Sequence, residues 1–127
     1  MPEFSQISKD RLATCHPDLQ RLWNDVIQHV DCAIICGHRD QAAQDQAFHD
    51  GFSKLQWPHG PHNALPSNAV DAMRCPIDWN DDEGNKAFAA LVKERAMSLG
   101  IALDWGGDWT HGFVDPDHYQ LKAVPAC

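Results

Sequence analysis

A single acidic residue, Asp71, places the strongest constraint on how this chain folds. It lies in the middle of residues 69–73, whose other members are small or apolar and whose pattern predicts a short strand. A carboxylate held in such a strand is costly to bury unless a cation or a metal ion compensates its charge. The fold must therefore bring a charged or ligating partner to Asp71 from another part of the chain.

Two histidines are the candidate partners. His62 precedes the predicted strand in a proline-rich loop, and His118 begins a second alternating segment, residues 118–121. If the two strands pair, Asp71 and His118 meet across the sheet while the loop folds His62 over them. A hydrolytic zinc site needs about three such ligands, an open position for water and a nearby base. Asp115, three residues before His118, is the candidate base.

Other side chains compete for these roles. His38 and His111 are the alternative metal ligands, and His111 is also a candidate hydrogen-bond donor near the site. Asp117 is the alternative base, although we expect it to be structural. The remaining histidines of the polar segments are expected to be solvated; these are His16, His29, His49 and His59.

The sequence around these residues resembles the zinc peptidoglycan peptidases. That family includes D-alanyl-D-alanine carboxypeptidases and the L-alanyl-D-glutamate endopeptidases of phage endolysins. Three segments carry the resemblance: Gly37-His38-Arg39 followed by Gln44, His62 through Pro66-Ser67-x-Ala69-x-Asp71, and Trp105-Gly106-Gly107-Asp108-Trp109. It extends over residues 19–121, and the Pro-Ser-x-Ala-x-Asp ending matches the phage endopeptidase variant.

The resemblance implies a role for each site residue. The zinc ligands would be His62, Asp71 and His118. Asp115 would be the catalytic base, accepting a proton from the attacking water and passing it to the departing amine. Arg39 would contact the substrate and help to stabilise the oxyanion, and we expect Gln44 to bind substrate beside it.

One position departs from the family pattern. Many members have serine two positions before the first zinc ligand, whereas this chain has Gly60. Any contact that the serine hydroxyl makes with ligand or substrate is therefore missing here. The predicted metal set is intact.

Composition limits the other possibilities. With 127 residues, the chain is expected to form one catalytic domain, residues 1–127, without a separate wall-binding module. A net charge of -8 argues against nucleic acid as the partner. The N-terminal residues lack the features of a signal peptide, and no segment approaches the ~20 apolar residues of a membrane span. We expect a monomer that is made in the host cytoplasm and reaches bacterial peptidoglycan after release by another factor.

The five cysteines are expected to be reduced thiols, because their number is odd and no secretion signal precedes them. Cys32 and Cys36 share a face of a predicted strand over residues 32–37. We interpret both as small core residues and not as a metal-binding pair. Cys75 is also expected to be structural.

Three helices and four strands are predicted. The first helix begins at Pro17 and carries an apolar stripe made of Leu19, Leu22, Trp23, Val26, Ile27 and Val30. The second is capped by Asp40 and ends near residue 50, before Gly51. The third follows Asn80, which forms a candidate capping box with Glu83, and ends before Gly100.

The order of these elements indicates the fold class. Strands are expected at residues 32–37, 69–73, 101–105 and 118–122, with loops too short for many parallel crossovers. We therefore predict an α+β fold with a small, mainly antiparallel sheet packed with about three helices. The resemblance implies the same architecture, that of Hedgehog-type and D-Ala-D-Ala peptidase domains.

The expected function is that of a phage endolysin, a zinc-dependent endopeptidase that hydrolyses the L-alanyl-D-glutamate bond of the peptidoglycan stem peptide. Two alternatives stay open. A D-alanyl-D-alanine carboxypeptidase or dipeptidase would normally carry an export signal. A non-catalytic zinc-binding relative would not need the candidate base, Asp115.

Overall fold

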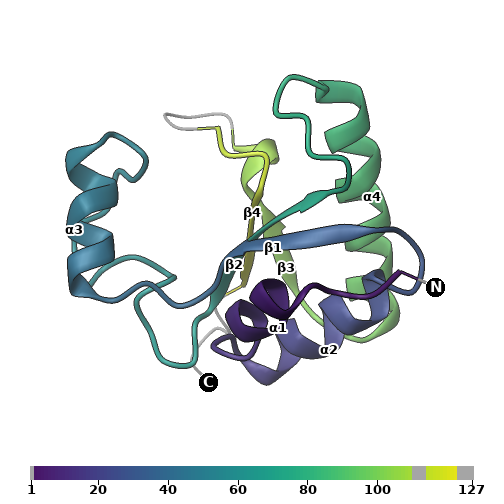
Figure 1. Ribbon diagram of the computed structural model, residues 1–127, viewed down its shortest axis with the longest axis horizontal. Helices are drawn as coiled ribbons and strands as arrows, with labels where there is room; N and C mark the ends of the chain where they lie inside the picture. The colour runs from purple at the N-terminus through teal and green to yellow at the C-terminus, as the bar shows by residue number, and fades with distance from the viewer. Residues whose placement is uncertain (1, 110–113, 123–127) are drawn as a thin grey trace.

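The structure, a computed structural model, describes residues 2–109 and 114–122. Its elements within these ranges are α1 (Gln6–Leu12), α2 (Pro17–Val26), β1 (Cys32–Cys36), α3 (Gln41–His49), β2 (Ala69–Arg74), α4 (Asp82–Ser98), β3 (Leu103–Trp105), the 3-10 turn η1 (Gly106–Asp108) and β4 (His118–Leu121). The strands form one sheet in the order β1-β2-β4-β3, and every pairing is antiparallel (Figure 1). The predicted α+β class is confirmed.

The three predicted helices are present, and their capping explains where they start. Pro17 opens α2, and the Asp40 side chain accepts a hydrogen bond from the Ala43 N–H at the start of α3. The cap predicted for α4 was wrong by one residue. Asp81 caps the helix by accepting from the Gly84 N–H, while the Asn80 N–H is bound by the side chain of Asp78.

The first helix, α1, was not predicted. Its start is a Ser5 side chain that accepts from the Ser8 N–H. Only Ser8 and Leu12 are buried within it, so it has no apolar stripe to reveal it in the sequence. Its place is fixed by contact with β1, where the Ser8 hydroxyl accepts a hydrogen bond from the Ile34 N–H.

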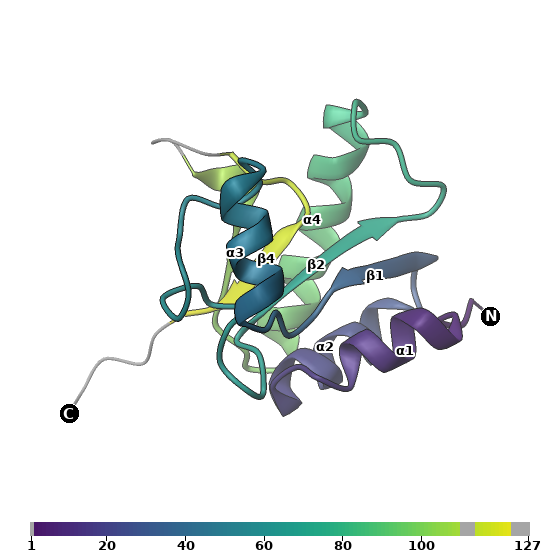
Figure 2. The ribbon, with the colours of Figure 1, turned by 60° about the vertical axis from the view of Figure 1, so that its left-hand side comes forward.

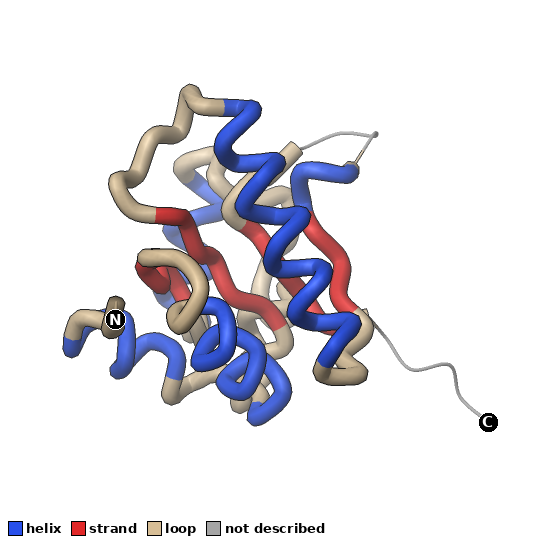
Figure 3. Tube along the Cα trace, turned by 90° about the vertical axis from the view of Figure 1, so that its right-hand side faces the viewer, coloured by secondary structure: helices blue, strands red, loops and turns tan. Residues whose placement is uncertain are grey.

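One face of the sheet forms the hydrophobic core. Val70 and Tyr119 point to this face, which α2 and α4 cover. Figure 3 shows α4 lying across the strands. The Trp23 ring of α2 packs edge-on against Tyr119, with ring centroids 5.2 Å apart. No helix in residues 2–109 and 114–122 is long and apolar enough to cross a membrane.

The opposite face of the sheet carries polar side chains. It lies toward α3, which stands apart from α4 on the other side of the strands (Figures 1 and 2). The loop that joins α3 to β2 also lies on this side. Helix α3 is mostly polar, and Gln44 is its one buried residue. The sheet therefore separates an apolar core from a polar surface that can hold a site.

An irregularity in β1 decides which face Cys36 occupies. Ile34 pairs with Ala72 and Cys36 pairs with Asp71, so the extra residue between them, Ile35, forms a bulge. Cross-strand partners share a face, so Cys36 lies on the side of Asp71. The interpretation of Cys36 as a core residue was therefore wrong, because the bulge breaks the alternation. Cys32, which precedes the bulge, is 3% exposed in the core, as predicted.

Candidate metal centre and catalytic site

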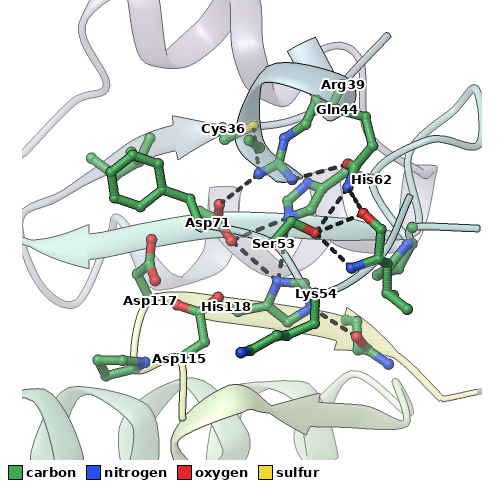
Figure 4. Close-up of a pocket in the computed structure, with 18 of the residues that line it drawn as sticks. Cys36, Arg39, Gln44, Ser53, Lys54, His62, Asp71, Asp115, Asp117 and His118 are labelled. Atoms are coloured by element: carbon green, nitrogen blue, oxygen red, sulfur yellow. Dashed lines mark hydrogen bonds and ion pairs between the residues drawn. The ribbon is translucent and has the colours of Figure 1, made fainter. Parts of the chain in front are cut away.

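Three ligand-type side chains from three segments converge on the polar face of the sheet (Figure 4). Asp71 of β2 and His118 of β4 are direct cross-strand partners, and His62 reaches them from the loop before β2. His62 Nε2 lies 3.2 Å from Asp71 Oδ1 and 3.3 Å from His118 Nδ1, and His118 Nδ1 lies 3.2 Å from Asp71 Oδ1. The pairing that the sequence predicted for Asp71 and His118 is confirmed.

The spacing of these atoms fits a divalent metal. Ligands at ~2.0–2.1 Å from a tetrahedral zinc ion are separated from one another by roughly 3.3 Å. The side chains of the three residues are between 4% and 11% exposed, which suits a centre shielded from bulk water. Among residues 2–109 and 114–122, ligand-type atoms gather in two groups, and the atoms within each group lie within 4.8 Å of one another. One group is Cys36, His62 and Asp71, and the other is Asp71, Asp115 and His118.

Hydrogen bonds behind the two rings fix which nitrogen faces the centre. His62 Nδ1 lies 2.8 Å from the Gly37 carbonyl oxygen, and His118 Nε2 lies 2.7 Å from Gln120 Oε1. Each acceptor requires an N–H at the nitrogen that it contacts. The inward nitrogen of each neutral ring is then unprotonated and available to a metal.

Strong electrostatic coupling marks the cluster. Burial alone would raise the pKa of Asp71, but hydrogen bonds with His118 and His62 outweigh it and hold this pKa well below its usual range. Burial lowers the pKa of His62, whereas hydrogen bonds with Asp71 and Cys36 raise it to about 10. In the absence of a metal, the protein thus places positive charge opposite the buried carboxylate.

Asp115 lies beside the candidate metal centre, close to His118 (Figure 4). Its carbonyl oxygen accepts from the His118 N–H in a tight turn, and its own N–H donates to the Gly106 carbonyl. A side-chain carbon on Gly106 would lie 2.2 Å from the Asp115 carbonyl oxygen. Glycine is required at that point of the Trp-Gly-Gly-Asp segment, because the backbone of the candidate base passes so close to it.

Asp117, the alternative base, differs from Asp115 in its surroundings. It is 8% exposed, and its side chain belongs to neither group of ligand-type atoms. Burial and a hydrogen bond with Asp115 raise the pKa of Asp117 to about 9. Its carbonyl oxygen also accepts from the Ala72 N–H, so its backbone joins the turn to the centre of β2.

Arg39 follows β1 and faces the buried carboxylate. Its Nη2 atom lies 3.6 Å from Asp71 Oδ2 and 3.9 Å from Cys36 Sγ, while Nη1 donates to Gln44 Oε1 over 3.1 Å. The side chain is 16% exposed and lines the cleft. The structure therefore places Arg39 beside the candidate metal ligands, and hydrogen bonds to other residues hold part of its guanidinium.

Gln44 lies beneath Arg39 and is only 1% exposed. Its oxygen accepts from Arg39, and its amide nitrogen donates to the Ser53 hydroxyl and the Leu55 carbonyl. In this arrangement, Gln44 joins Arg39 to the loop after α3. The substrate contact predicted for Gln44 stays a prediction. The hydrogen bonds of its amide all join it to other residues of the protein.

Asn63 belongs to the same network and was missed in the sequence. Its Nδ2 donates to the Arg39 carbonyl and to Gln44 Oε1, and its Oδ1 accepts from the Gly60 N–H over 2.8 Å. A side-chain carbon on Gly60 would lie only 2.7 Å from Asn63 Oδ1. A larger residue at position 60, serine included, would therefore require the Asn63 amide to shift. The sequence feature that could have identified Asn63 is its position directly after His62.

The competing histidines lie elsewhere or outside the described residues. His38 is in neither group of ligand-type atoms, and His111 falls outside the described residues. His16 is not merely solvated, because its Nδ1 accepts from the Asp18 N–H and caps α2. The other three expected to be solvated are exposed; they are His29, His49 and His59.

A cleft of about 880 Å³ gives access to the centre. Helix α3 and the following loop form one wall, and the segment before β4 contributes to the other. Trp109 lines the cleft with its ring 5.2 Å from that of His118, whereas Trp105 is buried and donates to the Pro116 carbonyl. Trp57, in the loop between α3 and β2, is half-buried.

Comparisons with known proteins agree with this geometry. A family model described as phage L-alanyl-D-glutamate peptidase matches residues 2–126. The crystal structure of the Serratia marcescens L-Ala D-Glu endopeptidase ChiX is similar, with 26% identity and a TM-score of 0.79 over 94% of this chain and 90% of that one. No curated protein sequence matches significantly. The chain belongs to the phage L-alanyl-D-glutamate peptidase family.

Proposed function

We propose that this protein is a zinc-dependent peptidoglycan endopeptidase that hydrolyses the L-alanyl-D-glutamate bond of the stem peptide, as a phage endolysin does. The observation that carries the proposal is the convergence of His62, Asp71 and His118 at separations of 3.2–3.3 Å on the floor of a cleft. The family match and the described activity of the Serratia relative support the choice of bond.

The ligand set assigned to zinc is His62 Nε2, His118 Nδ1 and one oxygen of Asp71. When bound, zinc supplies Lewis acidity for a water molecule and for the scissile carbonyl. Two neutral imidazoles and one carboxylate leave one net positive charge on such a centre, which favours an anionic transition state. The Gly37 carbonyl and Gln120 hold the two rings in the tautomers that this role requires.

Asp115 is the proposed general base. It accepts the proton of the attacking water and then delivers it to the amine of the departing D-glutamyl peptide. Its carboxylate lies in one group with the ligand atoms of Asp71 and His118, whereas Asp117 lies outside that group. The half-buried position of Asp115 at the cleft also leaves it accessible to the substrate.

Arg39 is the proposed electrophilic partner of the scissile carbonyl. Gln44 and Asp71 hold its guanidinium at the edge of the centre, so that little reorganisation is needed as negative charge develops on the oxygen. A lysine would offer a point charge without this fork of donors.

Mass spectrometry of digested peptidoglycan tests the proposed bond. The expected products are glycans that retain L-alanine and peptides with a new N-terminal D-glutamate. Release of free D-alanine or D-alanyl-D-alanine, with the Ala-Glu bond intact, would support the carboxypeptidase or dipeptidase alternative. Full zinc content without any product would support a non-catalytic zinc-binding protein.

A further inference from the structure

Two side chains with a permanent positive charge line the cleft among the described residues, Arg39 and Lys54. Arg39 is already surrounded by the protein, because its guanidinium contacts Asp71, Gln44 and Cys36. Because some of its N–H donors already contact these residues, Arg39 cannot offer all of them to a carboxylate of the substrate. A negatively charged group of a substrate would therefore need another partner.

The surroundings of Lys54 differ from those of Arg39. It is exposed, and its ammonium group makes no hydrogen bond or ion pair with any residue in the described part of the chain, whereas Lys93, Arg95 and Lys122 are each paired with an aspartate. Figure 4 shows its side chain among those that line the cleft, which also include His118 and Asp115. The cleft thus contains an unpaired cation on the same lining as the proposed reaction centre.

Hydrogen bonds hold the turn that contains Lys54 in place. Its neighbours Ser53 and Leu55 both accept hydrogen bonds from the buried amide of Gln44. The Ser53 hydroxyl also accepts from the Leu55 N–H, which closes a tight turn around Lys54. Because the turn is held at both sides, the lysine is presented to the cleft from a defined position, which reduces the ordering cost of binding.

The protein as a whole would repel an anionic substrate, because its net charge is -8. A cation on the cleft wall offsets this repulsion locally. The D-glutamyl residue of the proposed substrate has two carboxyl groups, and its amine is used in the bond to L-alanine. One carboxyl group continues the peptide, and the other is either a free carboxylate or a carboxamide.

We propose that Lys54 binds this second carboxylate and makes the enzyme prefer stem peptides in which it is free over those in which it is amidated. The inference rests on the proposed function, since it assumes cleavage on the amino side of D-glutamate. Lys54 is then a specificity-determining residue on the leaving-group side, separate from Arg39, which acts on the scissile carbonyl. The charge pair lies at an exposed rim, so it is sensitive to salt.

The test uses two synthetic stem peptides that differ only in this group, carboxylate in one and carboxamide in the other. We expect the wild-type protein to favour the carboxylate in kcat/KM by about tenfold, mainly through KM, which is the range of one charged hydrogen bond. Lys54→Gln should remove the preference, Lys54→Arg should keep it, and added salt should weaken it only where the charge is present.

Lys86→Gln is the matched control, because Lys86 is an exposed lysine of α4 that does not line the cleft. The Lys86→Gln variant should prefer the carboxylate peptide as strongly as the wild type does. A Lys54→Gln protein that still favours the carboxylate tenfold, or that loses kcat equally on both peptides, would overturn the inference while leaving the proposed function intact. If the wild type cuts neither peptide at the Ala-Glu bond, the proposed function itself fails. Zinc content and melting temperature verify that each variant is folded.

Discussion

The two faces of the sheet use the same strands in opposite ways. On the core face, Val70 and Tyr119 pack against α2 and α4, and each contact is one of many similar ones. On the cleft face, Asp71 and His118 depend on a few specific polar partners. Adjacent residues of β4 thus lie on different faces, with His118 proposed as a metal ligand and Tyr119 packed in the core. Damage on the core face should reduce stability, and damage on the cleft face should reduce metal binding or catalysis.

The largest effect is expected from His118→Ala. This change removes one of three proposed ligands, so hydrolysis should fall on the order of 10³-fold or more, and bound zinc should be lost. Metal content measured by elemental analysis, together with a peptidoglycan turbidity assay, checks this result. The metal-free variant should melt below the metal-free wild type, because buried Asp71 loses one of the hydrogen bonds that compensate its charge. Full zinc occupancy in the variant would contradict the ligand assignment.

Asp115→Asn separates the base from the ligands. The amide cannot accept the water's proton, so we expect hydrolysis to fall by roughly 10²-fold or more while zinc content stays at the wild-type level. Asp117→Asn serves as the control on the same turn and should have a smaller effect on the rate. The reverse ranking at equal zinc content would assign the base to Asp117.

Leu22→Ala tests the core face of the sheet. Leu22 of α2 is completely buried, and truncating it should lower the free energy of unfolding by about 3 kcal/mol through lost burial and a cavity. Urea denaturation of the zinc-loaded protein measures this. At a temperature where the variant is folded, kcat should match that of the wild type. A large change in kcat at full folding would show that the two faces are not independent.

The smallest effect is expected from Gln120→Ala. Gln120 shares the cleft face of β4 with His118, and its Oε1 accepts a hydrogen bond from the Nε2–H of that ring. Without this acceptor, the ring loses its fixed tautomer and orientation, so zinc affinity should fall about tenfold. Competition with a chelator of known affinity measures the change. Unchanged affinity would mean that β4 alone orients the ring.

Much of the fold was predictable from local patterns. The stripe of α2 and the alternation of β4 follow from periodic burial, and Asp71 could be identified because a carboxylate in an apolar strand needs a partner. These signals lie within single segments. The assignment of Asp115 over Asp117 came from the family resemblance, since both acids are close to His118 in the chain.

What the sequence did not reveal depends on contacts between segments. The bulge at Ile35 that turns Cys36 toward Asp71 leaves no mark in the residue types of β1. The burial of Gln44 follows from hydrogen bonds to a loop nine and eleven residues further along the chain. A polar helix with a single buried glutamine appears solvent-exposed in the sequence, because the apolar pattern does not record a polar network.

Gly60 couples substitutions at neighbouring positions of the cleft. A Cβ at this position would lie 2.7 Å from Asn63 Oδ1 and 3.1 Å from Gln44 Oε1, while the Gly60 N–H itself holds that Asn63 oxygen in place. A serine at position 60 would therefore require the Asn63 amide to shift. The effect of such a mutation depends on the residue at position 63, so changes at the two positions are not expected to be additive.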